Sequence, residues 1–364
     1  MKKCIFHYPG PISSKPSVGS ELRPYKMLEA FKNSGYEVIE VTGSSAERTK
    51  KIREIKDNIK KGIKYDFLYA ENRNIPTILA DEDHIPRHPL ADFSLFKICS
   101  DNDIPMGLFY RDCHWAFEEL RKGTSKLKRL ILDICIKAEL RKYVKFFKKI
   151  YLPSEEMHKY VFQNRDIDVL PPGGNIVENL NAFKMHGAND TLNVFYVGGI
   201  YGIYDITNIV KAVSQVENVN LTICTVKEQW DAYKGYYEPL MNERISIIHK
   251  KSDELKEYYK TAHFSLFLVN DNEYANMAMP IKVFEAINYG TPIVVSDNMA
   301  VAKIIKEEKC GWVIENSVDS LVGLLDYLKS NPEELSNKTQ NTILAASKHS
   351  WQVRTKKVIE DLTI

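Results

Sequence analysis

Residues 195–224, "FYVGGIYGIYDITNIVKAVSQVENVNLTIC", contain the pattern that decides the fold of this chain. A short apolar run is followed by a glycine-bearing loop, an amphipathic helical segment and a second apolar run. The same order opens the chain at residues 6–41, "FHYPGPISSKPSVGSELRPYKMLEAFKNSGYEVIEV". Strand, helix and strand in this order form the repeating unit of parallel α/β proteins. Both halves of the chain therefore begin with the same kind of unit.

Short apolar runs continue to alternate with helical patterns in both halves. Several runs are almost continuously apolar, as expected of strands that are covered by helices on both faces. The predicted strands are 2–8, 36–43, 64–71, 105–112, 148–154, 167–173, 192–199, 219–226, 244–250, 263–270, 291–297 and 311–315. We predict an α/β protein with two Rossmann-like, doubly wound domains that face a cleft.

The two predicted domains meet near "VLPPGGN", residues 169–175, because Pro-Pro-Gly-Gly breaks both helices and strands. We place the N-terminal domain at residues 1–172 and the C-terminal domain at 190–347, with a linker over about 172–191. A chain of 364 residues suits two such domains.

Composition indicates a soluble globular protein, with 44% hydrophobic and 27% charged residues. No apolar run approaches the length of a membrane span, and the N-terminus has too short an apolar stretch for a signal peptide. The six cysteines form no C-x-x-C pair, which argues for free thiols in the cytoplasm and against a structural zinc site.

Ligands of doubly wound sheets bind where strands run into loops and helix N-termini. After the strand at 192–199 come Gly198, Gly199 and Tyr201, and Thr225 follows the next strand. Glycines allow the backbone to approach a ligand closely, and a helix predicted over about 205–216 would offer its positive end to an anion. A plain tight turn is the structural alternative.

A second candidate lies in "MAMPIKVFEAINYGTPIVVSD", residues 277–297. Pro280 suits a first helical turn, so the amides of 277–281 are expected to point outward. Lys282 and Glu285 then lie three residues apart on one helix face. A lysine suits a diphosphate, and a carboxylate can accept from two ribose hydroxyls. The alternative is an exposed helical ion pair.

The segments at 279–297 and 309–321 resemble the donor-binding region of GT-B-type glycosyltransferases, which move a sugar from a nucleotide diphosphate to an acceptor. The pattern is group-1-like, with P-x-K-x-x-E in the donor helix. The likeness covers essentially the whole chain, through "VLPPGGN" at 169–175, "DELKEYYKTAHFSLF" at 253–267 and "HSWQVRTKKVIEDL" at 349–362.

This resemblance implies roles for particular residues. Glu285 would hold the ribose, Lys282 would lie near the diphosphate, and the amides around Asn276, Met277 and Ala278 would face phosphate and sugar. Gly290-Thr291-Pro292 would make the return turn to the next strand, and a C-terminal helix over about 348–364 would cross back to the N-terminal domain. The donor would be a nucleotide sugar, with UDP favoured over GDP, and no other cofactor.

Two departures from the family pattern stand out. Met277 occupies the position at which many retaining members carry the first of two glutamates. The basic pair that many members have after the first strand of the second domain is missing, which leaves Lys282 and backbone amides, with Arg23 or Arg111 as helpers. Retention or inversion of the anomeric configuration therefore stays open.

The first half supplies residues for the acceptor side. Gly19 and the amides after it could face the donor phosphates. The strand at 105–112 leads to Asp112 and His114, which alternate and so are expected to point to different sides. Asp112 is our candidate general base for an inverting reaction, whereas in a retaining enzyme His114 would contact the donor sugar. Their structural alternatives are a helix cap and a packed histidine.

Three further residues, Glu71, Arg73 and Arg111, also leave strand ends and are candidate acceptor-side residues.

Residues 121–150 contain eleven Lys and Arg against two acids, with Leu127, Leu130, Ile131, Ile134 and Ala138 at helical spacing. A basic amphipathic helix is typical of binding to an anionic membrane surface. The alternative is an ordinary helix packed on the sheet. Nucleic acid is not indicated, because the aromatic residues fit the apolar face rather than a stacking row.

The leading hypothesis is a metal-independent glycosyltransferase of the hexosyltransferase type. It would be cytoplasmic, peripheral on the inner membrane face, and act on a saccharide or lipid-linked acceptor in cell-surface polysaccharide or glycoconjugate synthesis. No D-x-D follows a strand of the donor domain; "DED" at 81–83 lies in a connecting region. The alternatives are a sugar-nucleotide epimerase and a catalytically degenerate nucleotide-binding or partner-docking protein.

Overall fold

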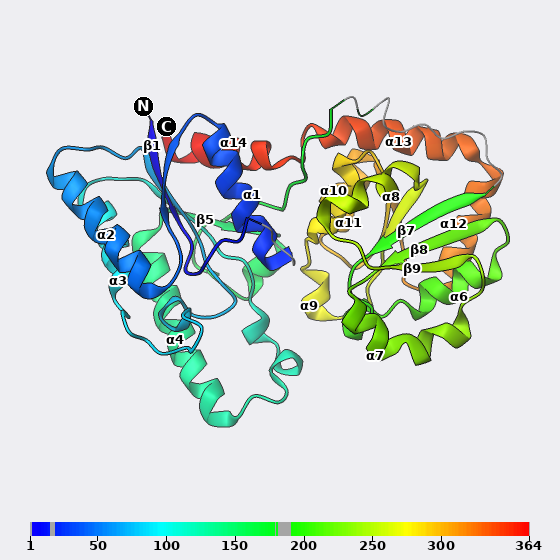
Figure 1. Ribbon diagram of the computed structural model, residues 1–364, viewed down its shortest axis with the longest axis horizontal. Coiled ribbons are helices and arrows are strands. Elements are labelled where there is room, and N and C mark those ends of the chain that lie inside the picture. Colours follow the sequence, from blue (N-terminus) through cyan, green and yellow to red (C-terminus); the bar gives the residue numbers. More distant parts are fainter. Residues whose placement is uncertain (1, 15–18, 179, 181–190, 364) are drawn as a thin grey trace. The chain divides into compact units, whose positions relative to one another are not determined.

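The computed structural model describes residues 2–14, 19–178, 180 and 191–363. The chain forms two compact units, residues 1–171 with 351–364 and residues 172–350 (Figure 1). Each unit contains a six-stranded parallel sheet. All twelve strands lie inside the segments predicted from sequence, so the predicted α/β fold with two Rossmann-like domains is confirmed. The predicted linker falls largely on residues 181–190, outside the described ones.

The sheet of the first unit has the order β2-β1-β3-β4-β5-β6. Its elements are β1 (Lys3–His7), α1 (Gly19–Asn33), β2 (Glu37–Val41), α2 (Ser45–Lys60), β3 (Phe67–Glu71), η1 (Thr77–Leu79), α3 (Ala91–Asp101), β4 (Met106–Phe109), η2 (His114–Ala116), η3 (Glu118–Arg121), α4 (Lys126–Phe146), β5 (Lys149–Leu152), η4 (Glu156–Lys159), β6 (Asp168–Val169) and α14 (Trp351–Thr363).

The C-terminal helix α14 belongs to the first unit, as the sequence predicted. It packs beside α1 and against β3 and β4. Trp351 and Val358 are buried in this contact, and the Arg354 Nε donates to the Pro171 carbonyl at 3.0 Å. Burying these apolar side chains contributes roughly 1.5–3 kcal/mol each, which accounts for the return of the chain end.

The sheet of the second unit has the order β12-β11-β10-β7-β8-β9. Its elements are β7 (Leu192–Val197), η5 (Gly202–Tyr204), α6 (Thr207–Gln215), β8 (Val219–Cys224), α7 (Lys227–Tyr237), η6 (Glu238–Leu240), β9 (Ile245–Ile248), η7 (Ser252–Leu255), α8 (Lys256–Thr261), β10 (Phe264–Phe267), α9 (Glu273–Asn276), α10 (Ile281–Asn288), β11 (Ile293–Ser296), α11 (Val301–Glu308), β12 (Gly311–Ile314), α12 (Val318–Ser330) and α13 (Pro332–Ala346).

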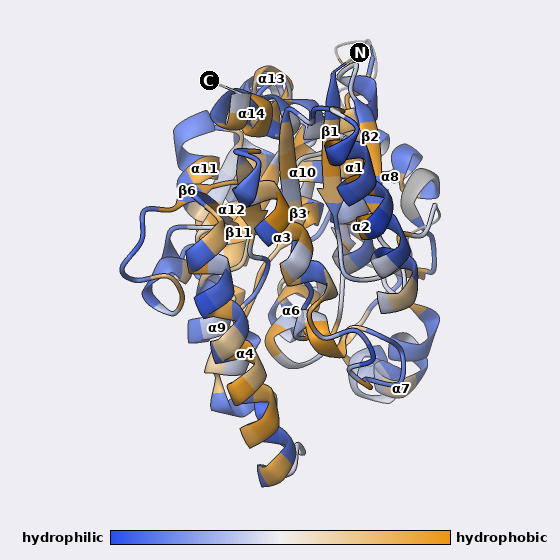
Figure 2. Ribbon diagram, turned by 90° about the vertical axis from the view of Figure 1, so that its left-hand side faces the viewer, coloured by the Kyte–Doolittle hydropathy of each residue, from blue (hydrophilic) through white to orange (hydrophobic). Residues whose placement is uncertain are grey.

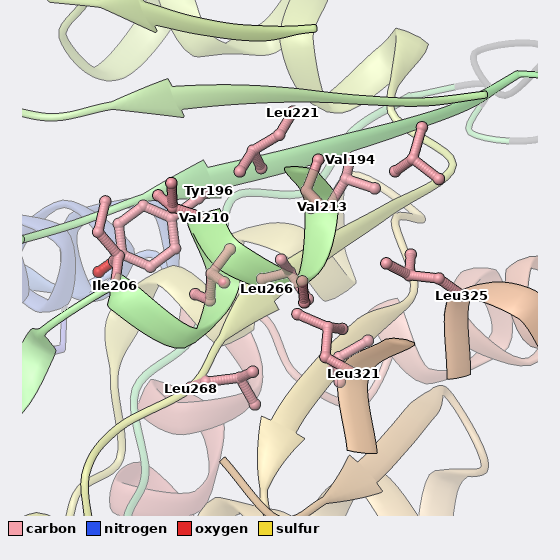
Figure 3. Close-up of a cluster of buried hydrophobic side chains, with 14 of the residues drawn as sticks. Val194, Tyr196, Ile206, Val210, Val213, Leu221, Leu266, Leu268, Leu321 and Leu325 are labelled. Atoms are coloured by element: carbon pink, nitrogen blue, oxygen red, sulfur yellow. The ribbon is translucent and has the colours of Figure 1, made fainter. Parts of the chain in front are cut away.

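Helices cover both faces of the second sheet. On one face, Val210 and Val213 of α6 and Leu321 and Leu325 of α12 pack against the strands (Figure 3). On the other face, α8, α10 and α11 supply the buried side chains Tyr259, Val283, Phe284, Ile287, Val301 and Ile305. Because helices cover both faces, a ligand is expected at the ends of the strands.

Candidate functional site

The candidate donor site lies at the carboxyl edge of the second sheet. Strand order reverses there between β7 and β10, and doubly wound proteins bind ligands at this switch point. The loops that follow these two strands are joined by a hydrogen bond from the Asn270 amide to the Ile203 carbonyl, at 3.1 Å. The loop after β10 leads through α9 into α10, which carries the predicted donor residues.

Lys282 and Glu285 lie on the first turns of α10, after Pro280 at the N-cap. The Lys282 Nζ lies 2.8 Å from Glu285 Oε2, with the side chains 29% and 17% exposed. Burial raises the pKa of the neighbouring Tyr259, and the charge of Glu285 raises it further. A partly exposed carboxyl side chain beside a lysine is therefore available at this helix start.

The prediction for the amides around 276–279 is wrong in part. The short helix α9, which the sequence did not predict, begins after an Asn272 cap. It uses the amides of Asn276, Met277 and Ala278, which donate to the carbonyls of residues 272, 274 and 275. Helix α10 begins at Ile281. The first backbone amides of a helix have no partner within it, so the first amides of α10 are the ones beside Lys282 that could donate to a ligand.

Met277, Asn276 and Ala278 are nevertheless part of this loop. Met277 is 6% exposed, so its side chain belongs to the interior. The Asn276 side-chain amide reaches the Asp271 carboxylate at 3.3 Å. The predicted return turn after α10 is present, with Gly290 at a φ of 65°, a conformation that glycine adopts without strain.

The glycine loop after β7 also differs from expectation. Gly198 and Gly199 are followed by η5, and α6 begins only at Thr207. The Asp205 carboxylate accepts from the Thr207 amide at 2.7 Å. A carboxylate therefore already occupies the amino end of α6, and it would repel a phosphate there. If the loop after β7 binds an anion, the backbone amides of the loop would bind it, and not the amino end of α6.

Tyr201 and Thr225 are placed differently from each other. Tyr201 is 48% exposed and stacks on Tyr233 of α7, with ring centroids 5.5 Å apart and planes 7° apart. Thr225 is buried, and its hydroxyl lies 3.5 Å from the Gln229 side-chain oxygen. Tyr201 thus has a surface open to a ligand, whereas the Thr225 side chain is buried beside Gln229 of α7.

In the first unit, Asp112 and His114 lie together, contrary to the expectation that they point to different sides. The His114 amide donates to Asp112 Oδ1 at 3.0 Å, and the His114 Nδ1 lies 3.6 Å from Oδ2. The reason is that β4 ends at Phe109, so the alternation of a strand does not reach these residues. The Asp112 carboxylate also accepts from the Asn74 side-chain amide, at 3.3 Å. The two candidates form one polar pair at a strand end.

Glu71 lies in the interior of the first unit. Its side chain has no exposed surface, and it accepts from the Tyr69 hydroxyl at 2.9 Å. The Arg23 Nε and the Arg111 Nη2 lie 3.3 Å and 3.6 Å from its two oxygens. Arg23 also stacks on Phe109 at 3.4 Å. Glu71 therefore neutralises two arginines and has no surface that an acceptor could touch.

The remaining residues predicted in the first unit hold the backbone. Arg73 donates to the carbonyls of Pro9 and Ala80, at 3.3 Å and 3.0 Å. Arg111 is 13% exposed and donates through its amide to Asn72 Oδ1 at 2.7 Å. Gly19 is the first residue of α1, and residues 15–18 before it lie outside the described ones.

The structure also contains a polar cluster that no sequence pattern indicated. Asp92 of α3 accepts from Arg48 of α2 at 2.8 Å and lies 2.8 Å from the His7 Nε2. All three side chains are buried. Burial acts to raise the pKa of Asp92, but the bonds and charges of His7 and Arg48 outweigh it and hold this pKa well below its usual range. The three residues are far apart in the chain and have no common spacing.

Helix α4 confirms that the predicted basic segment is helical between residues 126 and 146. Its buried residues are Ile136, Glu139 and Tyr143. The predicted apolar stripe is exposed instead, with Leu127, Leu130, Ile131 and Ile134 at 69%, 57%, 47% and 60%. At about 100° per residue, the stripe lies on the side of the helix opposite the buried residues. Helix α4 therefore packs on the first unit through its other face, and the stripe predicted to meet a membrane surface is left exposed.

Figure 2 shows hydrophobic segments, in orange, along α4. Among the described residues, no helix combines the length and apolar content that crossing a membrane requires. The described residues also contain no group of three His, Cys, Asp or Glu side chains placed to hold a metal ion. All six cysteines are free thiols.

Comparisons with known proteins agree with this geometry. Residues 180–345 match the family described as glycosyl transferases group 1. No curated protein matches the chain significantly. Among solved structures, HepE from Anabaena in complex with UDP-glucose has a TM-score of 0.64 at 12% identity, with 100% of both chains covered.

Two further solved structures are similar over their full length. A glycosyltransferase from Rickettsia africae has a TM-score of 0.63 at 12% identity, covering 99% of this chain and 98% of that one. WaaG, a glycosyltransferase involved in lipopolysaccharide biosynthesis, has a TM-score of 0.55 at 14% identity, with 100% of both chains covered.

These findings define a GT-B glycosyltransferase fold. The match of residues 180–345 to the group 1 family and the similarity to these structures confirm the resemblance to GT-B-type glycosyltransferases, while the P-x-K-x-x-E pattern of the donor helix stays a prediction.

Proposed function

We propose that this protein transfers a sugar, of the hexose type, from a uridine diphosphate sugar to a lipid-linked saccharide during assembly of a cell-surface polysaccharide or glycoconjugate. The observation that carries the proposal is the Lys282–Glu285 pair on the first turns of α10, inside the residues that match the family. The UDP-glucose bound by HepE and the role of WaaG in lipopolysaccharide synthesis support the choice of donor and of acceptor class.

In the proposed reaction, an acceptor hydroxyl attacks the anomeric carbon and the bond from that carbon to the diphosphate breaks. Glu285 accepts from the ribose hydroxyls, and Lys282 offsets the negative charge of the leaving diphosphate without a metal ion. In an inverting reaction Asp112 takes the proton of the acceptor hydroxyl. In a retaining reaction no base is needed in that role, and His114 contacts the donor sugar.

A nucleotide panel tests the donor site. We would measure thermal unfolding with uridine, guanosine, adenosine, cytidine and thymidine diphosphates. UDP at a hundred times its Kd should stabilise the protein by about 2.7 kcal/mol. The substitution Glu285→Ala should abolish this gain, whereas Glu307→Ala, which removes an exposed carboxylate on α11, should leave it unchanged.

Other outcomes point to other functions. If none of the five nucleotides stabilises the protein, the non-catalytic alternative is favoured. If a UDP-sugar is converted to an isomer at the same rate with and without a saccharide acceptor, the chain is an epimerase instead. A donor that is consumed only in the presence of acceptor supports the transferase.

We also propose that α4 holds the enzyme on the inner face of the membrane. The exposed stripe would enter the acyl boundary, while Arg141, Lys142 and Lys145 on the same exposed side would meet anionic headgroups. Each cation near such a surface contributes on the order of 1 kcal/mol. A lipid-linked acceptor would then lie in the same surface as the enzyme.

Sedimentation with vesicles tests this attachment. The protein should bind vesicles that contain phosphatidylglycerol, less so at high salt, and only weakly bind phosphatidylcholine vesicles. Ile134→Asp should weaken binding about tenfold or more, because it removes an apolar side chain that would be buried in the membrane. Leu344→Asp is the matched control, since Leu344 is 68% exposed on α13 of the second unit. Equal binding by both variants would argue against α4 as the contact.

A further inference from the structure

Asp271 stands at the switch point of the second sheet. The chain leaves β10 through Val269, whose amide donates to the Ser296 hydroxyl of β11 at 2.8 Å. The next amide, of Asn270, donates to the Ile203 carbonyl in the loop after β7, at 3.1 Å. Asp271 is therefore fixed between the loops of two neighbouring strands, and its side chain is exposed.

Two asparagine side chains hold one oxygen of this carboxylate. Asn298, after β11, donates to Asp271 Oδ1 at 3.0 Å, and Asn276 of α9 donates to the same oxygen at 3.3 Å. These two hydrogen bonds lower the pKa of Asp271, so its carboxylate is ionised at neutral pH. Among the described residues, no group donates to the second oxygen, Oδ2.

The same arrangement leaves two amide oxygens unsatisfied. Asn276 Oδ1 and Asn298 Oδ1 are both buried and have no hydrogen-bond partner among the described residues. Each such group costs about 1–3 kcal/mol. If either side-chain amide were rotated by 180°, its oxygen would face the Asp271 carboxylate. Two acceptor oxygens would then repel each other, which is less favourable. The arrangement that holds Asp271 in one position is therefore energetically unfavourable for the two asparagines. Unsatisfied buried groups of this kind call for an explanation, and a functional role of Asp271 is one.

The chemistry of the site restricts the ligand. A fixed carboxylate repels phosphate, so Asp271 suits a neutral part of the donor rather than its diphosphate. A cation is disfavoured at Oδ1, because two N–H groups already point at this oxygen. Oδ2 remains as an acceptor for hydroxyl groups, which form strong hydrogen bonds with carboxylates. The neighbouring Met277 offers no polar group and is buried.

We infer that Asp271 recognises hydroxyl groups of the donor's sugar, with Asn276 and Asn298 as positioning residues. This inference rests on the proposed function, because it assigns part of the same donor site. It makes Asp271 a residue that selects among sugars that carry the same nucleotide.

The test compares Asp271→Asn with the wild type. Calorimetric titration would give the Kd for UDP, UDP-glucose, UDP-galactose and UDP-N-acetylglucosamine. The variant should bind UDP as the wild type does. It should bind the preferred UDP-sugar about ten- to hundred-fold more weakly, the usual loss for a hydrogen bond to a charged group. Discrimination among the three sugars should fall by the same factor.

Controls separate this role from a structural one. Asp297→Asn removes another exposed carboxylate, one residue before Asn298, and should change neither Kd nor selectivity. Asn298→Ser should reduce the selectivity among the three sugars partly and leave the affinity for UDP unchanged. This second variant keeps the inference testable if Asp271→Asn folds poorly. If both the Asp271 and the Asn298 variants still bind UDP and show unchanged selectivity among the sugars, this inference is overturned while the proposed function stands. Failure of the wild type to bind UDP overturns the proposed function and this inference together.

Discussion

Glu71 and Glu285 illustrate two ways in which this protein uses a carboxylate beside a cation. Glu71 ends β3 of the first unit, has no exposed surface and lies close to Arg23 and Arg111. Glu285 lies on α10 of the second unit, is 17% exposed and pairs with Lys282 on the same helix. The sequence proposed ligand contacts for both residues.

The difference in burial separates the two roles. A buried ion pair is needed by the fold, because loss of one partner leaves an uncompensated charge in the interior. A partly exposed pair within one helix contributes only a few tenths of a kcal/mol, so the fold can give it up to a ligand. Burial, rather than position after a strand, therefore indicates which carboxylates at a sheet edge can bind a substrate.

The largest expected effect is at Glu71. Glu71→Ala should lower the free energy of unfolding by about 3–5 kcal/mol, since Arg23 and Arg111 lose their buried counterion. Urea denaturation measures this, with Glu37→Ala as the control, because Glu37 is 46% exposed in its pair with Lys3. A variant of normal stability that loses only acceptor binding would break the comparison and return Glu71 to the acceptor site.

A second interior carboxylate gives a pH test of the same idea. Asp92→Asn should lower the free energy of unfolding by about 3 kcal/mol at pH 7. The pKa of Asp92 is lowered in the folded state, so the stabilisation is present above the unfolded value of about 4 and is lost as pH falls toward the folded value. The difference between wild type and variant should therefore stay constant above about pH 5 and shrink progressively as pH falls below it in urea titrations. A constant difference would contradict an ionised Asp92.

A smaller effect is expected at Tyr69, whose hydroxyl donates to Glu71 at 2.9 Å. Tyr69→Phe keeps the buried ring and removes one hydrogen bond to a carboxylate. We expect a loss of about 1–3 kcal/mol in the free energy of unfolding, below that of Glu71→Ala. A loss as large as that of Glu71→Ala would show that the hydroxyl, not the arginines, is the main partner of Glu71.

The smallest stability effect is expected at the donor pair. Lys282→Ala and Glu285→Ala should each change the free energy of unfolding by no more than about 0.5 kcal/mol, measured by urea denaturation in the absence of nucleotide. Both variants should nevertheless lose stabilisation by UDP. A loss of several kcal/mol without nucleotide would make the pair structural and remove the contrast with Glu71.

Particular elements show what could be predicted from sequence. The strands could be predicted because they are short apolar runs followed by turn residues. In the structure these runs are largely buried, as in β7 and β11. Lys282 and Glu285 were found because helical spacing alone places them on one face. The exposed stripe of α4 was visible as a pattern, but the pattern did not show that a second face, around Ile136 and Tyr143, makes the contact with the unit.

Other features depended on the ends of elements and on distant contacts. The amides of Asn276, Met277 and Ala278 were misplaced because a four-residue helix, α9, has no sequence period long enough to detect. Asp112 and His114 were expected on different sides because β4 was predicted to run further than Phe109. Propensity leaves such boundaries uncertain by a few residues.

The sequence by itself determined the two parallel sheets and the helix that carries Lys282 and Glu285, because periodicity and local spacing set them. Only the tertiary structure decided which charges are interior, as with Glu71 and Asp92, and that Asn276 and Asn298 meet at Asp271. Burial and pairing between residues far apart in the chain depend on how whole elements pack, and no local pattern encodes that.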